Sequence, residues 1–248
     1  MSTKKIFISG GSRGIGRSIT LKFAQEGYQV LFTYKNSDKE ALELIDYIVQ
    51  NYNCPLPQCY KCDMSDAGEV KQLFKENKEE FSSIYTLVNN VGGQGKLKPF
   101  MFCSNEYFQE ILGINLMSVV NTVREVLPIF IRNKEGRIVN ITSIAGTKGN
   151  PGHSAYATSK GAIIGFSKSI VKEVGGMGVI INSVAPGFVQ TESIEDVPEK
   201  YLKQRIDNSI YKRMGMPEEI ANVAYYLGTS SPEYLTGQEI IVDGGITG

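Results

Sequence analysis

The chain has 248 residues, of which 42% are apolar and 21% are charged, so it can bury a full hydrophobic core. That composition excludes a disordered chain and a small scaffold held together by disulfides. The 26 basic and 26 acidic residues cancel, which argues against a basic surface for nucleic acid. Apolar runs reach only about half a dozen residues, far short of the ~20 of a membrane span, so we expect a soluble, unprocessed cytoplasmic protein with no membrane partner.

Six short apolar runs rich in β-branched residues predict strands, and segments with helical spacing separate them. The expected strands cover residues 5–9, 29–33, 86–89, 137–141, 179–184 and 239–242, with a weaker seventh at 58–62. Runs that are apolar on both faces are typical of a parallel sheet with helices on both sides. Since no repeat or linker divides the chain, we predict an α/β fold: one doubly wound Rossmann-type domain over residues 1–248, with a seven-stranded, mostly parallel sheet.

The first strand leads into a glycine loop, Gly10-Gly11-Ser12-Arg13-Gly14-Ile15-Gly16, and then into an amphipathic segment. Gly10 and Gly14 permit a tight turn, Gly16 lets the helix approach the strand, and the helix N-terminus offers N–H groups to a pyrophosphate. A glycine triplet alone is a weak signal, but a strand and a helix flank this one. The loop therefore predicts a dinucleotide site.

The end of the second strand bears on which dinucleotide binds. An acid there would accept the ribose 2′-hydroxyl hydrogen bonds of NAD, but none stands before Asp38, which belongs to a capping box formed by Ser37 and Glu40. Arg13 and Lys35 could both face a 2′-phosphate, which favours NADP(H). The alternative, that both cations are ordinary solvated surface residues, stays open.

Cys59 and Cys62, around the weak seventh strand, have the C-x-x-C spacing of a metal site, and Cys54 lies close to them in sequence. A fourth ligand is missing, because Cys103 lies far along the chain and His153 is the only histidine. We therefore predict reduced thiols at a strand edge and no metal.

Two side chains with proton chemistry, Tyr156 and Lys160, lie one helical turn apart. An unperturbed tyrosine has a pKa near 10, so it needs help as an acid or base near neutrality, and an adjacent ammonium would lower that pKa. Thirteen residues before the tyrosine, Thr142-Ser143 closes a strand, so a hydroxyl there could share a substrate carbonyl oxygen with Tyr156. The spacing Y-x-x-x-K is also common on helix surfaces that carry no function.

The least regular segment, residues 188–216, is polar and charged, and a helix with proline in its first turn follows at Pro217. We expect a mobile substrate lid within 188–216.

Two other kinds of catalysis, serine hydrolysis and phosphoryl transfer, lack their motifs. Ser143 has no G-x-S-x-G of a serine hydrolase around it, and Gly16 is followed by Arg17-Ser18 in the wrong register for a P-loop.

Taken together, these motifs resemble the short-chain dehydrogenase/reductase family across essentially the whole chain. The segments that carry the resemblance are Gly10 to Gly16, Asn89-Asn90-Val91-Gly92, Asn115, Ser143, Tyr156, Lys160 and Pro186-Gly187. The resemblance implies that Tyr156 exchanges a proton with the substrate oxygen and that Ser143 holds that oxygen. It implies further that Lys160 binds the nicotinamide ribose and lowers the tyrosine pKa, while Asn115 supports a water in the proton relay.

The resemblance also assigns the cofactor site. Asp63 matches the adenine contact, and Asn89 and Asn90 match the motif that steadies the central sheet beside the cofactor. The segment from Pro186 to Thr191 matches the part that holds the nicotinamide amide. The residues predicted to contact NADP(H) are Gly10, Ser12, Arg13, Gly14, Ile15, Gly16, Tyr34, Lys35, Asp63, Asn89, Val91, Gly92, Tyr156, Lys160, Pro186, Gly187, Val189 and Thr191.

Within the family, the chain is most similar to bacterial β-ketoacyl carrier-protein reductases, in segments such as 11–17, 184–192 and 235–245. This similarity implies NADPH-dependent reduction of a β-ketoacyl thioester in fatty acid or polyketide biosynthesis. Segment 91–100 departs from the reductase pattern, with Val91 in place of the usual alanine and a second glycine after the motif, and is reminiscent of bacterial hydroxysteroid dehydrogenases. Two alternatives stay open: a hydroxysteroid or other secondary-alcohol dehydrogenase, and a nucleotide-binding sensor without turnover.

The similarity also implies a partner, an acidic acyl carrier protein docked on basic residues near the active-site entrance. Lys134, with Arg132 and Arg137 nearby, keeps the first of two expected docking positions. The second position carries Met177 in place of an arginine, and Lys172 is the nearest substitute.

A homotetramer is implied as well, with the long helices after residues 104 and 154 paired across a two-fold axis. The small and apolar face of the second helix serves either that contact or the chain's own core. Its residues are Ala162, Ile163, Gly165 and Phe166.

Overall fold

The computed structural model describes residues 4–192 and 199–247, so the middle of the predicted lid, 193–198, lies outside the described residues. Seven strands form one sheet in the order β3-β2-β1-β4-β5-β6-β7, and every neighbouring pair is parallel. The strands are β1 (Lys5–Ser9), β2 (Gln29–Tyr34), β3 (Gln58–Lys61), β4 (Ile84–Asn89), β5 (Gly136–Ile141), β6 (Val179–Pro186) and β7 (Glu239–Val242). The predicted fold class is confirmed, and each strand begins and ends within two residues of its expected position.

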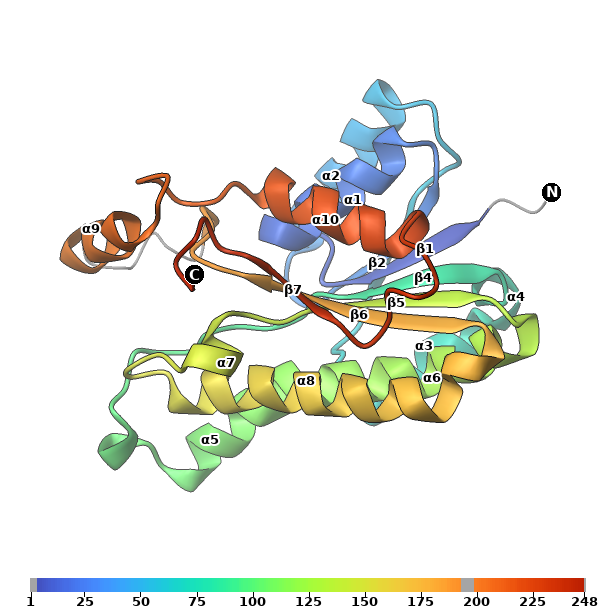
Figure 1. Ribbon diagram of the computed structural model, residues 1–248. Helices are drawn as coiled ribbons and strands as arrows, with labels where there is room; N and C mark the ends of the chain where they lie inside the picture. The colour runs from blue at the N-terminus through green and yellow to red at the C-terminus, as the bar shows by residue number, and fades with distance from the viewer. Residues whose placement is uncertain (1–3, 193–198, 248) are drawn as a thin grey trace.

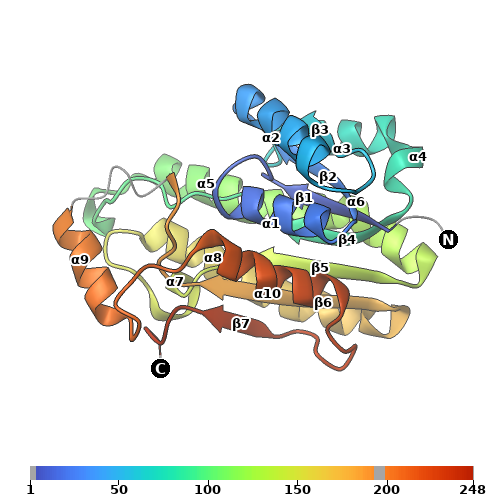
Figure 2. The same cartoon turned by 90° about the horizontal axis from the view of Figure 1, so that it is seen from above.

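Helices cover both faces of the sheet (Figure 1). One face carries α1 (Gly14–Gln25), α2 (Asp38–Asn51) and α10 (Pro217–Thr229), and α1 and α10 lie side by side along the sheet (Figure 2). The other face carries α3 (Ala67–Glu76), α4 (Lys78–Phe81), α5 (Asn105–Leu112), α6 (Ser118–Asn133) and α8 (Ser154–Val174). Two shorter helices, α7 (Ala145–Lys148) and α9 (Glu199–Asn208), lie beyond the carboxyl ends of the strands.

The sheet is buried on both faces. In β1, Ile6 and Ile8 pack into the core under α1 and α10, whereas Phe7 points the opposite way against Phe74 and Phe81. All three β1 side chains are fully buried. Because side chains alternate between the faces of a strand, a sheet covered on both sides requires continuous apolar runs, which is the pattern of the sequence.

The helical run Asn105–Asn133 is long and apolar enough, by length and composition, to cross a membrane. It comprises α5, a π-helical turn η2 (Gly113–Met117) and α6. In its most apolar window 44% of the run is buried, and Val119, Val123, Val126 and Phe130 pack into the core beneath the sheet. This is the packing of a core helix.

Local signals mark several of the helix ends. Gly27, with φ +83°, ends α1, and α10 begins at Pro217. α2 also begins where Ser37 predicts, but the capping box does not form. The hydroxyl of Ser37 instead shares a 2.7 Å hydrogen bond with the hydroxyl of Ser12 in the glycine loop. A contact across the fold therefore replaces the local cap.

The C-x-x-C pair does not converge. Cys59 packs with the core on one face of the sheet and Cys62 with the core on the other. Three residues along an extended chain reverse the side-chain direction, so the two thiols point apart. Burial raises the pKa of the Cys62 thiol to about 12. Among residues 4–192 and 199–247, no three His, Cys, Asp or Glu side chains gather as a metal site would require.

The two ends of the predicted lid lie beside each other. The Gly215 amide donates to the Phe188 carbonyl at 2.9 Å, and the Gln190 amide donates to the Gly215 carbonyl at 2.9 Å. The lid segment therefore leaves and re-enters the domain at one place, and α9 lies between its ends.

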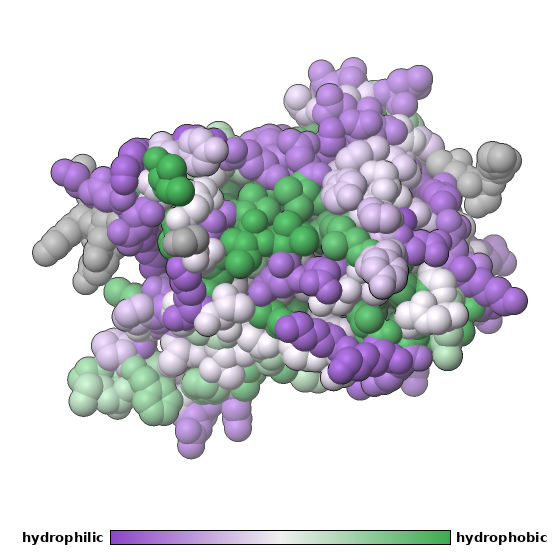
Figure 3. Space-filling view, viewed as in Figure 1, coloured by the Kyte–Doolittle hydropathy of each residue, from purple (hydrophilic) through white to green (hydrophobic). Residues whose placement is uncertain are grey.

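Of the four residues considered for a tetramer contact, Ile163 is fully buried in the chain's own core. Ala162 and Phe166 are half-buried and Gly165 is exposed, so the outer side of α8 keeps only part of the expected face. Apolar surface also gathers where α10 and the edge strand β7 lie (Figure 3), and Ile241 is 46% exposed there. The tetramer stays a prediction.

The structure corrects the expectation for Arg137. Its side chain is buried, and its guanidinium donates to the Tyr85 hydroxyl at 2.9 Å and to the Ser231 hydroxyl and carbonyl at 2.7 and 2.9 Å. It also donates to the carbonyl of Leu227. Arg137 thus joins β5 to the end of α10 and is not available to a docking partner.

We predict that Arg137→Met lowers the free energy of unfolding by about 2 to 4 kcal/mol, because several buried acceptors lose their donor. Urea denaturation measures the loss. Arg132→Met, which removes an exposed cation from the end of α6, is the matched control and should change stability by less than about 0.5 kcal/mol. Equal stability of the two variants would show that the Arg137 bonds are not stabilising.

Candidate active site

The glycine loop lies where the winding of the sheet reverses, between β1 and β4. Gly10 has φ +67°, and a Cβ at Gly16 would collide with the carbonyl oxygen of Gly10. Asn90, after the end of β4, donates from its side-chain Nδ2 to that same oxygen at 2.8 Å. Its backbone N–H donates to the Ser9 hydroxyl at 3.0 Å. The loops after two neighbouring strands are therefore held together at the crevice where such folds bind ligands.

The segment after β6 lies over this loop. Gly14 has φ +52°, and a Cβ built there would lie 3.5 Å from Thr191 and 3.6 Å from the carboxylate of Glu192. Gly14 also begins α1, whose first amides have no partner within the helix. The predicted contacts Gly14 and Thr191 thus lie beside each other at the start of α1, where unpaired amides can receive a pyrophosphate.

A cavity of about 410 Å³ lies between α1 and α2, beside the glycine loop. Its cations are Arg13 and Arg17, and Arg17 lies 5.7 Å from the centroid of the Tyr47 ring. The remaining lining residues are Ser12, Glu40, Glu43, Leu44 and Glu192. The cavity gives Arg13 the position expected of a residue that faces a 2′-phosphate.

Lys35 and Asp63, both predicted to contact the cofactor, bind each other in an ion pair. Burial by itself would raise the pKa of Asp63, but the hydrogen bonds from Lys35 and Ser65 outweigh it and lower the pKa. The same ion pair raises the pKa of Lys35. A phosphate would therefore have to share Lys35 with Asp63, and Arg13 is the less committed of the two predicted cations.

Two predicted cofactor residues act on the protein core instead. Asn89 is buried and donates to the side chain of Asn140 at 2.8 Å, which in turn donates to Ser167, so Asn89 joins β4 to β5 and α8. Val189 is buried in the main core. The contacts of Asn89 agree with its expected part in steadying the central sheet.

The catalytic candidates meet at the carboxyl ends of β4 and β5. Tyr156 and Lys160 are both buried on α8, and the Lys160 ammonium lies 5.8 Å from the centroid of the Tyr156 ring. Ser143, just after β5, lies near enough to the Tyr156 phenol to lower its pKa, and Lys160 donates to the Ile141 carbonyl at 2.9 Å. Two hydroxyl groups and an ammonium therefore converge from a strand end and one face of a helix.

Asn115 and Gly92 complete this cluster. Asn115 is fully buried in the π turn η2, where its side chain accepts from the Gly93 amide at 3.0 Å and donates to the Gly93 and Ile111 carbonyls. A Cβ at Gly92 would lie 2.5 Å from Asn115 Oδ1 and 3.0 Å from Lys160 Nζ. The Asn115 side chain thus fastens the loop after β4 against the lysine.

The electrostatics differ from the expectation for Tyr156. Burial raises the pKa of the Tyr156 phenol, and the hydrogen bond from Ser143 opposes that shift only in part. Burial lowers the pKa of Lys160 to about 8. The Lys160 ammonium donates to the Ile141 carbonyl, and the raised pKa of the phenol keeps it protonated near neutrality.

The comparisons agree with this geometry. A family model described as enoyl-(acyl carrier protein) reductase matches residues 10–247. A 3-oxoacyl-[acyl-carrier-protein] reductase FabG of Staphylococcus aureus is 33% identical over 98% of both chains. The 3-oxoacyl-[acyl-carrier-protein] reductase of Synechocystis is 34% identical over 99% of this chain and 98% of the relative, and that of Thermotoga maritima 34% over 98% and 97%.

The chain belongs to the short-chain dehydrogenase/reductase family. It is therefore an oxidoreductase, and this family uses a nicotinamide dinucleotide. The residues present fit that cofactor, because the loops after β1 and β4 meet at the carboxyl ends of the strands and a cavity of about 410 Å³ lies beside the glycine loop.

The expected docking residues lie at the edge of the sheet opposite to Tyr156. Lys134 precedes the start of β5 and Lys172 lies near the end of α8, so both are at the amino edge of a parallel sheet, as is Arg132. Tyr156 lies at the carboxyl edge. The 16 residues of helix from Tyr156 to Lys172 span about 24 Å. Within one chain these cations are remote from the reacting group.

Sequence reasoning placed Phe188 and Arg205 only within the predicted lid and did not link them to His153, which it expected at the mouth of the pocket. Phe188, Arg205 and His153 come from the segment after β6, from α9 and from the start of α8. Arg205 lies 5.0 Å from the centroid of the Phe188 ring, and its charge acts on His153. No local pattern links these positions, because only the fold brings the three segments together.

We predict that Gly92→Ala lowers turnover by about 10²-fold, because the added methyl group displaces Asn115 or Lys160 and misplacements near 1 Å have that cost. Steady-state kinetics measure the loss. Gly93→Ala is the matched control, since a Cβ at Gly93 meets open space and its amide still donates to Asn115. Comparable rates for the two variants would contradict this account of Gly92.

Proposed function

We propose that this protein catalyses NADPH-dependent reduction of a β-ketoacyl thioester to the β-hydroxyacyl form. The observation that carries the proposal is the convergence of two hydroxyl groups, those of Ser143 and Tyr156, beside the buried Lys160, with Ser143 near enough to lower the pKa of the phenol. Two hydroxyl donors on one point suit a carbonyl oxygen that gains negative charge. The names of the relatives support a 3-oxoacyl thioester as the ketone.

In the reaction, the bound nicotinamide supplies the hydride. The Ser143 hydroxyl donates a hydrogen bond to the ketone oxygen and orients it toward the phenol. Tyr156 transfers its proton to that oxygen, and the raised pKa keeps the phenol protonated until charge develops there. Lys160, with a pKa of about 8, can act as an ammonium beside the resulting phenolate and stabilise it.

The matching family model carries the description of an enoyl reductase, but the arrangement of the site favours a ketone. Reduction of a carbon–carbon double bond requires a proton at carbon, whereas Ser143 and Tyr156 together present two O–H groups for one oxygen. A nucleotide-binding sensor would need neither hydroxyl group nor the buried lysine, because binding alone requires no proton donor.

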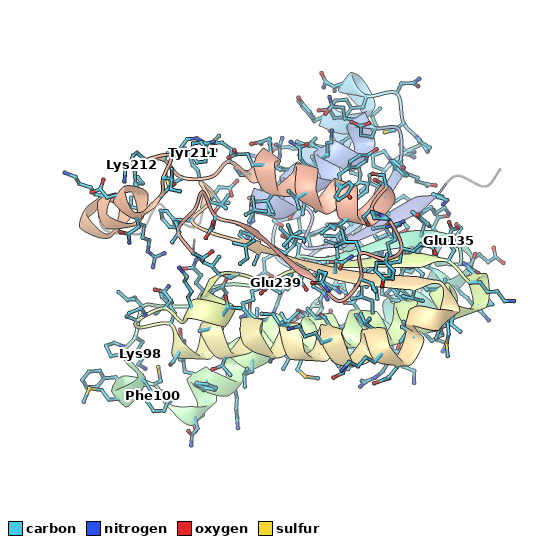
Figure 4. All side chains as sticks on the ribbon, in the orientation of Figure 1. Lys98, Phe100, Glu135, Tyr211, Lys212 and Glu239 are labelled. Carbon is cyan, nitrogen blue, oxygen red and sulfur yellow. The ribbon has the colours of Figure 1, made fainter. Side chains whose placement is uncertain are left out.

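A second candidate, a dehydrogenase of hydroxysteroids or other bulky secondary alcohols, is favoured by one observation. The segment that departs from the reductase pattern and the two residues after it expose Leu97, Phe100, Met101 and Phe102, by 54 to 81%. Phe100 and Lys98 lie at the same end of the molecule as Tyr211 (Figure 4). At that end, Phe100 and Lys98 lie on one side and Tyr211 on the other. An apolar rim of this kind would suit a large apolar ketone.

The carrier protein, the pathway and the compartment belong to the same proposal. A carrier-bound substrate in fatty acid or polyketide biosynthesis fits the names of the relatives, and a cytoplasmic homotetramer fits the family. The placement of Lys134 and Lys172 at the amino edge gives a single chain no docking site for the carrier beside its own Tyr156.

We predict that Tyr156→Phe retains cofactor binding and loses turnover by about 10² to 10⁴-fold, because it deletes the transferred proton and little else. Turnover with a β-ketoacyl thioester and fluorescence titration with NADPH measure the two effects. A variant that kept more than a tenth of the wild-type rate would show that the phenol is not the acid.

NADPH should be preferred to NADH, because Arg13 faces the cavity beside the glycine loop and no acid occupies the end of β2. A charge-assisted contact at this exposed position predicts about a tenfold preference, which Arg13→Ala should abolish. Arg17→Ala, in the same cavity but farther along α1, is the control and should keep the preference. Equal efficiency of the wild-type protein with both cofactors would reject the assignment to NADPH.

A further inference from the structure

Arg205 on α9 brings a guanidinium to the mouth of the catalytic crevice. α9 lies at the carboxyl end of the sheet, beyond the strand ends (Figure 1). The guanidinium carbon of Arg205 lies 5.0 Å from the centroid of the Phe188 ring. Phe188 follows directly after Pro186-Gly187 at the end of β6, in the segment predicted from the sequence to hold the nicotinamide. The arginine therefore faces the crevice from its open side.

The positive charge of Arg205 also affects His153, at the start of α8. His153 is the residue that precedes α8, three positions before Tyr156, and its ring is buried with Nδ1 3.4 Å from the Gln94 carbonyl oxygen. Burial lowers the pKa of His153, and the positive charge of Arg205 lowers it further. Arg205 is thus within electrostatic reach of the turn of helix that carries Tyr156.

Among the side chains that the structure describes, no carboxylate forms an ion pair with Arg205 and no acceptor takes a hydrogen bond from it. Two other arginines of the chain have hydrogen-bond or ion-pair partners. Arg137 is buried with four hydrogen bonds, and the exposed Arg213 forms a bidentate ion pair with Glu219. Arg205 is half-buried, and burial lowers its pKa.

A half-buried cation without an anion is costly unless a ligand supplies the charge. The Phe188 ring stabilises the face of the guanidinium by a cation–π contact. That contact leaves the N–H donors in the guanidinium plane available, and their fork geometry matches carboxylate and phosphate oxygens.

We propose that Arg205 is a specificity-determining residue that binds an oxyanion carried by the ketone substrate. The inference rests on the proposed ketoreductase function and adds the chemical class of the group bound at the mouth. The oxyanion can be the phosphate of a pantetheine arm or a carboxylate on the acyl group itself. A neutral, wholly apolar ketone would leave Arg205 without its counter-ion.

Three β-ketoacyl substrates separate these cases. The first is a neutral N-acetylcysteamine thioester, and the second is the phosphopantetheine thioester of the same acyl group. The third is an N-acetylcysteamine thioester whose acyl chain ends in a carboxylate. We expect Arg205→Gln to raise KM about tenfold for at least one anionic substrate and to leave KM and kcat for the neutral thioester within about twofold. Arg205→Lys, which keeps the charge, should recover part of the loss. Lys203→Gln, an exposed cation on the same helix, is the matched control.

The pattern of losses decides the proposal. A tenfold effect confined to the phosphate or to the carboxylate supports it and names the source of the oxyanion. Equal losses on all three substrates would show that Arg205 only positions α9, and no effect on any anionic substrate would show that it binds no oxyanion; either result overturns the inference. If no β-ketoacyl thioester is reduced by the wild-type protein, the proposed function itself fails.

His153 offers a second readout that is independent of turnover. It is the only histidine of the chain, so proton NMR of untagged protein follows its titration directly. Arg205→Gln should raise the pKa of His153, because a nearby positive charge is removed, whereas Lys203→Gln should leave it unchanged. An unchanged His153 pKa in Arg205→Gln would place the guanidinium away from the crevice and overturn the proposal.

Discussion

The close approach of three backbone segments at the carbonyl oxygen of Gly10 positions the rest of the active site. That oxygen leaves no space for a side chain at Gly16, and it accepts a hydrogen bond from Asn90 at 2.8 Å. One atom therefore sets both the start of α1 and the direction of the loop after β4. Through that loop, Gly92 comes against Asn115 and Lys160, so the dinucleotide crevice and the catalytic cluster form one connected structure.

The cations around the crevice differ in whether another group of the protein already neutralises their charge. Lys35 is paired with Asp63, and Arg213 with Glu219. Lys160 is buried and bound to a carbonyl group, and its pKa falls to about 8. Arg13 and Arg205 have no such partner among the described residues, and they lie at opposite ends of the crevice. This distribution is that of a site that receives a negative charge at each end of its ligands.

Much of the fold followed from the sequence because strand and helix signals are local. Apolar runs gave all seven strands to within two residues, and the glycine loop and the Tyr156–Lys160 spacing located the two halves of the site. The predictions failed where a side chain found a distant partner. Ser37 binds Ser12 across the fold, Lys35 binds Asp63, and Arg137 is buried against α10. No short-range pattern contains those pairings.

The sequence by itself determined the α/β class, and it singled out the candidate dinucleotide loop and the candidate catalytic side chains, because each depends on residues within one or two turns of chain. Only the tertiary structure decided their electrical state and their surroundings. Burial raises the pKa of Tyr156, whereas the spacing to Lys160 alone predicted a lower one. The fold likewise placed Lys134 and Lys172 far from the crevice and brought Arg205 to it. Burial and long-range charge depend on every segment that packs nearby, and those segments are distant in the sequence.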